Sequence, residues 1–130
     1  MTTPKTNPVR LQLSRAKGAR LVSPNGLPIV SVVRPGRWGN QWIAERRGKV
    51  WVAVRVFGAS EIVSKPCDSQ SDATRLCVAS YRADLFSGQA EVTVGEVREF
   101  LLNKNLACWC RLGAPCHADT LLCVARGIYS

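Results

Sequence analysis

The alternation of hydrophobic and polar residues predicts β-strands in the first half of the chain. Residues 9–15 (VRLQLSR) alternate as a strand does when one of its faces is buried. A second strand is expected over residues 27–33 (LPIVSVV), after the turn-forming residues 23–26 (SPNG). Residues 49–57 (KVWVAVRVF) are rich in β-branched and aromatic side chains, which favour a third strand. Two prolines among polar side chains predict a disordered lead-in over residues 1–9.

Helical periodicity begins in the second half of the chain. Residues 71–86 are expected to form a helix that starts at Ser71 or Asp72 and stops before Gly88. The apolar positions at helical spacing are Leu76, Ala79, Ala83 and Phe86. Residues 93–104 open with a threonine followed three positions later by a glutamate, a capping-box pattern that predicts a second helix.

The end of the chain combines a short strand with a third helix. Residues 105–109 are apolar enough for a buried strand, and residues 116–126 return to a helical pattern. Strands that alternate with helices through connecting loops are typical of an α/β domain. We therefore predict a small single α/β domain over residues 10–130, in which a mixed sheet is flanked by about three helices.

Composition narrows the class of protein. Hydrophobic residues make up 46% of the chain and charged residues 21%, which are ordinary values for a globular fold. No segment approaches the roughly 18 apolar residues of a membrane span, and the N-terminus lacks the apolar run of a secretion signal. We therefore expect a cytoplasmic protein with no membrane partner. Its six cysteines are then reduced and serve metal binding, catalysis or burial.

The formal net charge of +9 is unevenly distributed. Residues 1–55 contain eleven lysines and arginines against one acidic residue, whereas residues 56–130 contain seven against eight. A one-sided positive field attracts polyanions such as nucleic acid. The alternative is a solvated basic face that only aids solubility, so the charge is compatible with a phosphate-bearing partner but does not specify one.

Three of the six cysteines and the only histidine lie within ten positions, in the segment CWCRLGAPCH (108–117). Because side chains alternate along a strand, Cys108 and Cys110 are expected on one face. The loop then leads into a helix whose first turn carries Cys116 and His117. All four side chains can therefore meet at the carboxyl end of the strand, where α/β folds commonly place ligand sites.

Three interpretations of this segment remain open. A zinc site needs four sulfur or nitrogen ligands, which Cys108, Cys110, Cys116 and His117 supply, although their spacing is not the usual paired C-x-x-C. A nucleophilic site needs only Cys116 or Cys108 beside His117, with Asp119 as a possible orienting group. The helix N-terminus would then lower the pKa of the thiol. In the third interpretation, the cysteines are small buried core residues.

The segment RPGRWGN (34–40) is a second candidate for ligand binding. Arg34 and Arg37 supply fork-shaped donors suited to phosphate, Trp38 offers a stacking face, and the glycines permit close backbone approach. Alternatively, this is a tight structural loop whose tryptophan fills the core. The candidate ligand-binding residues are Arg34, Arg37, Trp38, Gly39 and Asn40, together with Lys17 and Arg20 of the basic segment 14–20.

These motifs resemble a known family. The segments RLQLSRAKGAR, RPGRWGN and NKNLACWCRLGAPCHADTLL are similar to the domain-of-unknown-function family 4326, which is common in bacteriophages, prophages and bacteria. The resemblance covers residues 10–42 and 93–125, and it implies a phage or prophage protein in the bacterial cytoplasm. Signature positions would be held by Arg34, Trp38, Gly39, Asn40, Cys108, Trp109, Cys110, Cys116, His117 and Asp119. The family usually has Trp at Ala19 and Pro-Phe at Gln41-Trp42, and it brings no assigned activity.

We therefore predict a pocket between the RPGRWGN loop and the strand-to-helix turn that carries the cysteines. A nucleotide or a nucleic-acid phosphate is expected to bind there, with Arg34, Arg37 and the helix N-terminus as donors. An enzyme acting on nucleotides or nucleic acid is one hypothesis for such a pocket, and the cysteines and His117 would then supply its chemistry. The alternative is a non-catalytic module, basic or stabilised by zinc, that binds nucleic acid or a host protein.

Overall fold

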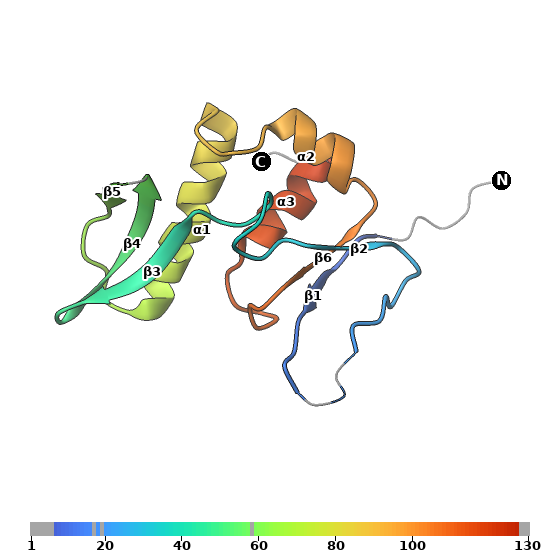
Figure 1. The fold of residues 1–130 in the computed structure, drawn as a ribbon, viewed down its shortest axis with the longest axis horizontal. Coiled ribbons are helices and arrows are strands. Elements are labelled where there is room, and N and C mark those ends of the chain that lie inside the picture. Colours follow the sequence, from blue (N-terminus) through green and yellow to red (C-terminus); the bar gives the residue numbers. More distant parts are fainter. Residues whose placement is uncertain (1–6, 17, 19, 58, 128–130) are drawn as a thin grey trace.

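The structure, a computed structural model, describes residues 7–16, 18, 20–57 and 59–127 of the 130-residue chain. The described part contains six strands and three helices (Figure 1). The strands are β1 (Arg10–Gln12), β2 (Ile29–Ser31), β3 (Trp42–Arg47), β4 (Val50–Phe57), β5 (Ser60–Val63) and β6 (Asn105–Cys108). The helices are α1 (Gln70–Ser87), α2 (Val94–Leu101) and α3 (His117–Ala125). None of these helices, within the described residues, is both long and apolar enough to cross a membrane.

The first sheet is parallel and joins strands from both ends of the chain. β6 lies between β1 and β2, so Leu106 pairs with Arg10 on one side and with Val30 on the other. All four residues of β6 are buried, as expected for the central strand of a parallel sheet. Leu106 shares one hydrophobic core with Val97 of α2 and Leu121 of α3. The sheet therefore supports the helix whose first turn carries the histidine.

The second sheet is antiparallel and contains the strands of the middle of the chain, in the order β3-β4-β5. α1 packs against β3 and β4 and lies between this sheet and the rest of the molecule (Figure 1). Trp42 of β3, Ala53 of β4 and Cys77 of α1 form a separate small hydrophobic cluster. This second unit has its own core beside that of the parallel sheet.

The hydrophobic pattern contains no signal for β3. Its sequence, WIAERR, ends in three exposed charged residues and lacks the alternation of a half-buried strand. The strand is held instead by antiparallel pairing that runs from Trp42 opposite Arg55 to Arg47 opposite Val50. Gly48, with φ of 64°, closes the hairpin in the left-handed conformation that such turns require.

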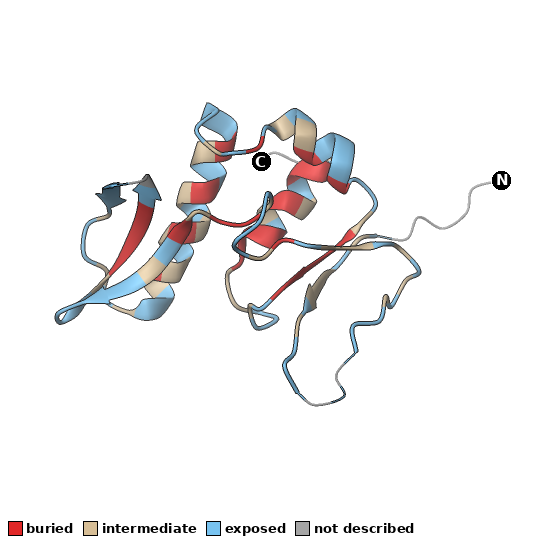
Figure 2. Ribbon diagram, viewed as in Figure 1, coloured by how far each residue is buried: buried red, intermediate tan, exposed pale blue. Residues whose placement is uncertain are grey.

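The predicted α/β class and the three helices are confirmed. The strands form two three-stranded sheets rather than one mixed sheet, because parallel pairing is confined to β1, β6 and β2. The predicted strands over 9–15 and 27–33 are also shorter in the structure. Figure 2 shows buried residues along β4 and β6 and on parts of all three helices.

α1 begins earlier than predicted and buries a different face. Its N-cap is Ser69, not Ser71 or Asp72, because the Ser69 side chain accepts the backbone N–H of Asp72. The buried residues are Ala73, Cys77, Tyr81 and Leu85. Of the predicted apolar positions, Ala79, Ala83 and Phe86 are exposed. The sequence carries two apolar rows at helical spacing, and packing against the sheet selects the other one. Gly88 ends the helix as predicted, with φ of 82°.

The predicted starts of the other two helices are confirmed within one residue. Thr93 and Glu96 form the capping box of α2, in which each side chain accepts the backbone N–H of the other residue. α2 ends at Leu101 rather than at residue 104, and Asn103 takes a positive φ of 61°. α3 begins at His117 with Cys116 as its N-cap.

The start of the described chain lies beside β6. The Val9 N–H donates to the Asn105 side chain at 3.0 Å, and the Asn7 carbonyl accepts from Asn25 at 3.0 Å. Residues 1–6 of the predicted lead-in lie outside the described residues.

Candidate functional site

A cavity of about 340 Å³ lies where β3 and α1 meet the turn between β6 and α3. Its lining consists of Val33, Arg34, Asn40 and residues 42–44, then Gln70, Thr74, Cys77 and Val78 of α1, and finally residues 108–110 and 115–117. The fold thus brings the RPGRWGN loop and the cysteine-bearing turn to one hollow. They are more than 60 positions apart in the chain.

Three cysteines converge on one side of this cavity. Cys108 ends β6, Cys116 caps α3, and Cys110 lies in the turn between them. The Sγ atoms of Cys108 and Cys116 are 3.2 Å apart, and all three Sγ atoms lie within 4.8 Å of one another. Cys108 and Cys110 meet on one side, as strand alternation predicts, whereas Trp109 between them is 45% exposed and also lines the cavity. We call these three residues the cysteine cluster.

Hydrogen bonds within the cysteine cluster make its thiols unequal. The bonds from Cys108 and Cys116 hold the pKa of the Cys110 thiol far below its usual range. Hydrogen bonds with Cys108, and to a lesser extent with Cys110, raise the pKa of the Cys116 thiol, and burial raises it further. The bond with Cys110 likewise raises the pKa of Cys108. These contacts favour a thiolate at Cys110 over one at Cys108 or Cys116.

Burial divides the cluster in the same way. Cys108 and Cys116 are each 2% exposed and belong to the main hydrophobic core, as the third interpretation of the segment expects. Cys110 is only half-buried and packs against that core. The most accessible thiol is therefore the one that its neighbours favour as thiolate.

His117 is fixed by contacts on the side away from the cysteine cluster. Its Nε2 lies 2.9 Å from the Val32 carbonyl and 2.8 Å from the Trp38 carbonyl. Carbonyl oxygens only accept, so Nε2 carries the proton and Nδ1 of the neutral ring has a free lone pair. That Nδ1 lies 3.9 Å from Cys116 Sγ. Tyr81 packs edge-on against the ring at 5.1 Å, and burial lowers the pKa of His117.

Asp119 pairs with Arg10. The Arg10 guanidinium donates to Asp119 Oδ2 at 3.1 Å and to the carbonyls of Ala114 at 2.9 Å and Arg111 at 3.0 Å. Arg10 thereby ties β1 to the turn that carries the cysteine cluster. Among the described contacts, the predicted orienting bond from Asp119 to His117 is absent.

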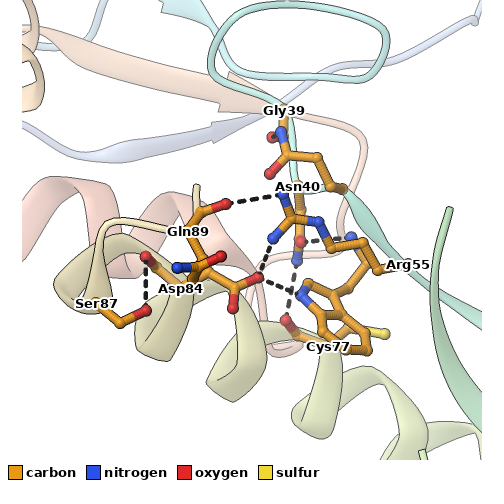
Figure 3. A network of polar contacts seen from close by, with 9 residues as sticks. Gly39, Asn40, Arg55, Cys77, Asp84, Ser87 and Gln89 are labelled. Carbon is orange, nitrogen blue, oxygen red and sulfur yellow. Dashed lines mark hydrogen bonds and ion pairs between the residues drawn. The ribbon is translucent and has the colours of Figure 1, made fainter. Parts of the chain in front are cut away.

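The RPGRWGN loop is shaped by its own arginine. Arg34 Nη1 donates to the carbonyls of Asn40 at 3.2 Å and Trp42 at 2.7 Å. Gly39 lies so close that a Cβ there would be 3.1 Å from the Arg34 Cα and Cγ atoms. Asn40 is buried and donates to the Cys77 carbonyl at 3.2 Å, which attaches the loop to α1 (Figure 3). The peptide bond between Arg34 and Pro35 is cis.

Of the other predicted ligand-binding residues, those that the structure describes do not line this cavity. Arg37 pairs with Glu96 at the start of α2 and lies over the rings of Trp38 and Phe100. Trp38 is half-buried and packs against the core, as the structural interpretation of the loop expects. Arg20 is exposed on the segment between β1 and β2, and Lys17 lies outside the described residues.

A comparison with protein-family models places the chain in one family. The family model described as a domain of unknown function, DUF4326, matches residues 11–127. The chain belongs to the DUF4326 family. Neither the curated proteins nor the solved structures contain a match. The pocket of this DUF4326 protein must therefore be interpreted from its own residues.

Part of the wall of the DUF4326 pocket carries no signal in the sequence. Trp42 and Thr74 line it from β3 and α1, but neither belongs to a recognisable motif. Cys77 lines it as well, is 4% exposed, and has its thiol pKa raised to about 11 by burial. Cys123 of α3 is exposed, because the helix buries a different face. Cys67 is half-buried, and its N–H bonds to the Trp51 carbonyl.

Proposed function

We propose that this pocket binds a nucleotide or a nucleic-acid phosphate between the RPGRWGN loop and the cysteine-bearing turn. The observation that carries the proposal is the shared cavity, whose volume of about 340 Å³ is in the usual range for small-ligand pockets. Trp42 and Trp109 supply aromatic surface in its wall, and Arg34 supplies a permanent positive charge.

Two features favour a negatively charged group in the ligand. The described bonds of Arg34 use one of its terminal nitrogens, which leaves further donors in the guanidinium fork. α3 directs its amino end, at His117, toward the same cavity, and a helix N-terminus favours an anion. The excess of basic residues in the first 55 positions would draw polyanions to this protein in the same way.

Calorimetric titration with AMP and with a short single-stranded oligonucleotide tests the proposal. We expect saturable binding that weakens as salt rises. Arg34→Gln should weaken AMP binding about tenfold or more, because a hydrogen bond to a charged group is worth about 1.5–3 kcal/mol. The control is Arg46→Gln in the exposed β3–β4 hairpin, which should leave affinity unchanged. Arg34→Lys keeps the positive charge but loses the hydrogen bonds that the guanidinium makes within the loop. Comparing its melting temperature with that of Arg34→Gln therefore separates the loss of charge from the loss of loop support.

A second candidate function is a zinc-stabilised module, favoured by the cysteine cluster. Zinc–sulfur bonds of about 2.3 Å place the sulfurs of a tetrahedral site about 3.8 Å apart. The three Sγ atoms already lie within 4.8 Å of one another, so small side-chain adjustments suffice to bind the ion. Elemental analysis of purified protein should find about one zinc per chain. Cys108→Ser should lose it and Cys123→Ser should retain it, since Cys123 lies outside the cluster.

A further inference from the structure

The cysteine cluster supplies three ligands, whereas zinc in proteins takes four. Cys108, Cys110 and Cys116 all line the cavity, so an ion bound to them would lie at its wall. The nature of the fourth ligand then decides what such an ion does. A closed site of four protein ligands stabilises a fold, whereas an open position can take a ligand.

His117 is the nearest candidate for the fourth ligand, but its ring is fixed elsewhere. Its Nδ1 approaches only Cys116, at 3.9 Å, and is not part of the group of ligand atoms that lie within 4.8 Å of one another. The ring is held at Nε2 by the carbonyls of Val32 and Trp38 and packs edge-on against Tyr81, so a shift of Nδ1 toward all three sulfurs would disturb these contacts. Loss of such buried bonds costs about 1–3 kcal/mol for each group left unpaired.

The other side chains near the cluster are also engaged or set apart. Asp119 is directed toward Arg10 and does not line the cavity. Asn40 lines the cavity, but its amide accepts the Trp42 N–H and donates to the Cys77 carbonyl. Within the described part of the chain, no fourth side chain joins the group that could hold a metal. Because the three cysteines line the cavity, the remaining coordination position of an ion bound to them would face it.

Charge selects the kind of ligand that this position takes. Three thiolates and Zn²⁺ form a complex with one net negative charge. A phosphate or carboxylate oxygen would be repelled by that charge, whereas a neutral ring nitrogen would not. Imidazole-type nitrogen is also a good donor to zinc. The phosphate of a nucleotide therefore belongs at Arg34, on the part of the wall that carries a positive charge.

We propose that a zinc ion bound by Cys108, Cys110 and Cys116 keeps its fourth coordination position open to the cavity and takes a neutral ring nitrogen of the ligand there. For a nucleotide, this places the base toward the cysteine cluster and the phosphate toward Arg34. The inference rests on the proposed function and on the zinc candidate, and it assigns the orientation of the ligand. His117 is then a positioning residue for the turn, not a zinc ligand.

Cobalt substitution tests the open position directly in the full-length protein. Co²⁺ replaces zinc with little change of geometry, and its visible absorption bands respond to each change of ligand. We expect imidazole, used as the probe, to shift these bands in the wild-type protein. An unchanged spectrum with saturating imidazole would overturn the inference while leaving the zinc candidate in place. Failure to bind any Co²⁺ or Zn²⁺ would overturn both.

The variant His117→Gln provides an independent check. With an open position, the variant and the wild type should show the same cobalt spectrum and the same response to imidazole. If His117 is the fourth ligand, the variant alone should respond to imidazole, which would contradict the inference. Should the variant fail to fold, the wild-type titration still decides. Cys123→Ser, on the exposed side of α3, is the matched control and should leave every spectrum unchanged.

AMP and ribose 5-phosphate separate this inference from the proposed function. We expect both to bind by calorimetry, but only AMP to shift the cobalt bands, because only AMP carries ring nitrogens. If AMP binds without a shift, the base does not reach the metal, and the inference is wrong while phosphate binding stands. If neither binds, the nucleotide proposal is wrong, and the proposed ligand orientation falls with it.

Discussion

At the scale of single residues, the pocket wall depends on how closely the RPGRWGN loop folds on itself. Gly39 has no room for a side chain, because an added Cβ would meet the Arg34 Cα and the Val33 carbonyl oxygen, each at 3.1 Å. Both contacts involve backbone atoms, which cannot move aside as a flexible side chain can. The requirement for glycine here is therefore steric, and it protects the position of Arg34.

Gly39→Ala should accordingly destabilise the protein by about 1–3 kcal/mol, the usual cost of overpacking. Urea unfolding measures the change in the free energy of unfolding. The control is Gly95→Ala in α2, where the nearest atom to an added Cβ is Thr93 Oγ1 at 3.8 Å. That control should be neutral or stabilise by up to about 1 kcal/mol, because alanine favours a helix more than glycine does. Equal effects at both positions would contradict the steric argument.

The sequence predicts the convergence of the cysteine cluster because that depends on local rules. Strand alternation places Cys108 and Cys110 on one face, and the helix start places Cys116 nearby. The direction of His117 follows from no local rule. It is set by two carbonyls that precede it in the chain by 79 and 85 positions. Arg10 was missed for the same reason, since its partners are brought to it by the pairing of β1 with β6.

At the scale of elements, α1 is joined to the antiparallel sheet by a buried polar network (Figure 3). Asp84 of α1 accepts the Trp42 indole N–H at 2.8 Å and forms an ion pair with Arg55 of β4. Arg55 also donates to the Gln89 carbonyl at 2.9 Å. The side chain of Arg55 is 7% exposed, so these partners must offset the cost of removing its positive charge from water.

Asp84→Asn should therefore cost about 3 kcal/mol or more, because it removes the negative partner of a buried charge. The measurement is the free energy of unfolding from urea titration followed by circular dichroism. Asp72→Asn on the same helix is the control, since its pair with Arg75 is exposed and spans 3.5 Å. That control should change stability by about 1 kcal/mol at most. A comparable loss in both variants would count against the network.

The capping box of α2 predicts a dependence of stability on pH. The pKa of the Glu96 carboxyl lies below its ordinary 4.5, mainly because the Thr93 N–H donates to it and secondly because Arg37 does. Because the pKa is lower in the folded state, the stabilisation is complete above the unfolded value and is lost as pH falls through the folded value. Glu96→Gln should thus lower stability at pH 6, and the difference from wild type should shrink below pH 4.5. Thr93→Ser, which keeps the cap, should follow the wild-type curve.

The sequence predicts the existence of the helices and strands better than it predicts which of their faces are buried. Helix ends follow local chemistry, as at Gly88 and at the Thr93 cap, and both are confirmed. The buried face of α1 depends on the antiparallel sheet, and that sheet includes a strand, β3, with no hydrophobic pattern of its own. The wall that α1 adds to the pocket was missed for this reason.

At the scale of the whole molecule, a metal at the cysteine cluster would join β6 to α3. Removal of zinc with a chelator should then lower the melting temperature of the wild-type protein, because a ligand that binds only the folded state stabilises it. Cys108→Ser should melt lower at the outset and should show no further change with chelator. Cys67→Ser, outside the cluster, should behave as wild type. Melting curves with and without chelator, in reducing buffer, provide the comparison.

The parallel sheet also constrains the order in which the protein can be made. β1 and β2 do not pair with each other, and each is completed only by β6, which follows β1 by about 95 positions. During synthesis, β1 and β2 therefore leave the ribosome before their common partner, and both stay unpaired until residue 108 has emerged. Such distant pairing slows folding. A chain stopped before β6 would expose both strands as edges, and it should aggregate or be degraded rather than persist as a partial fold.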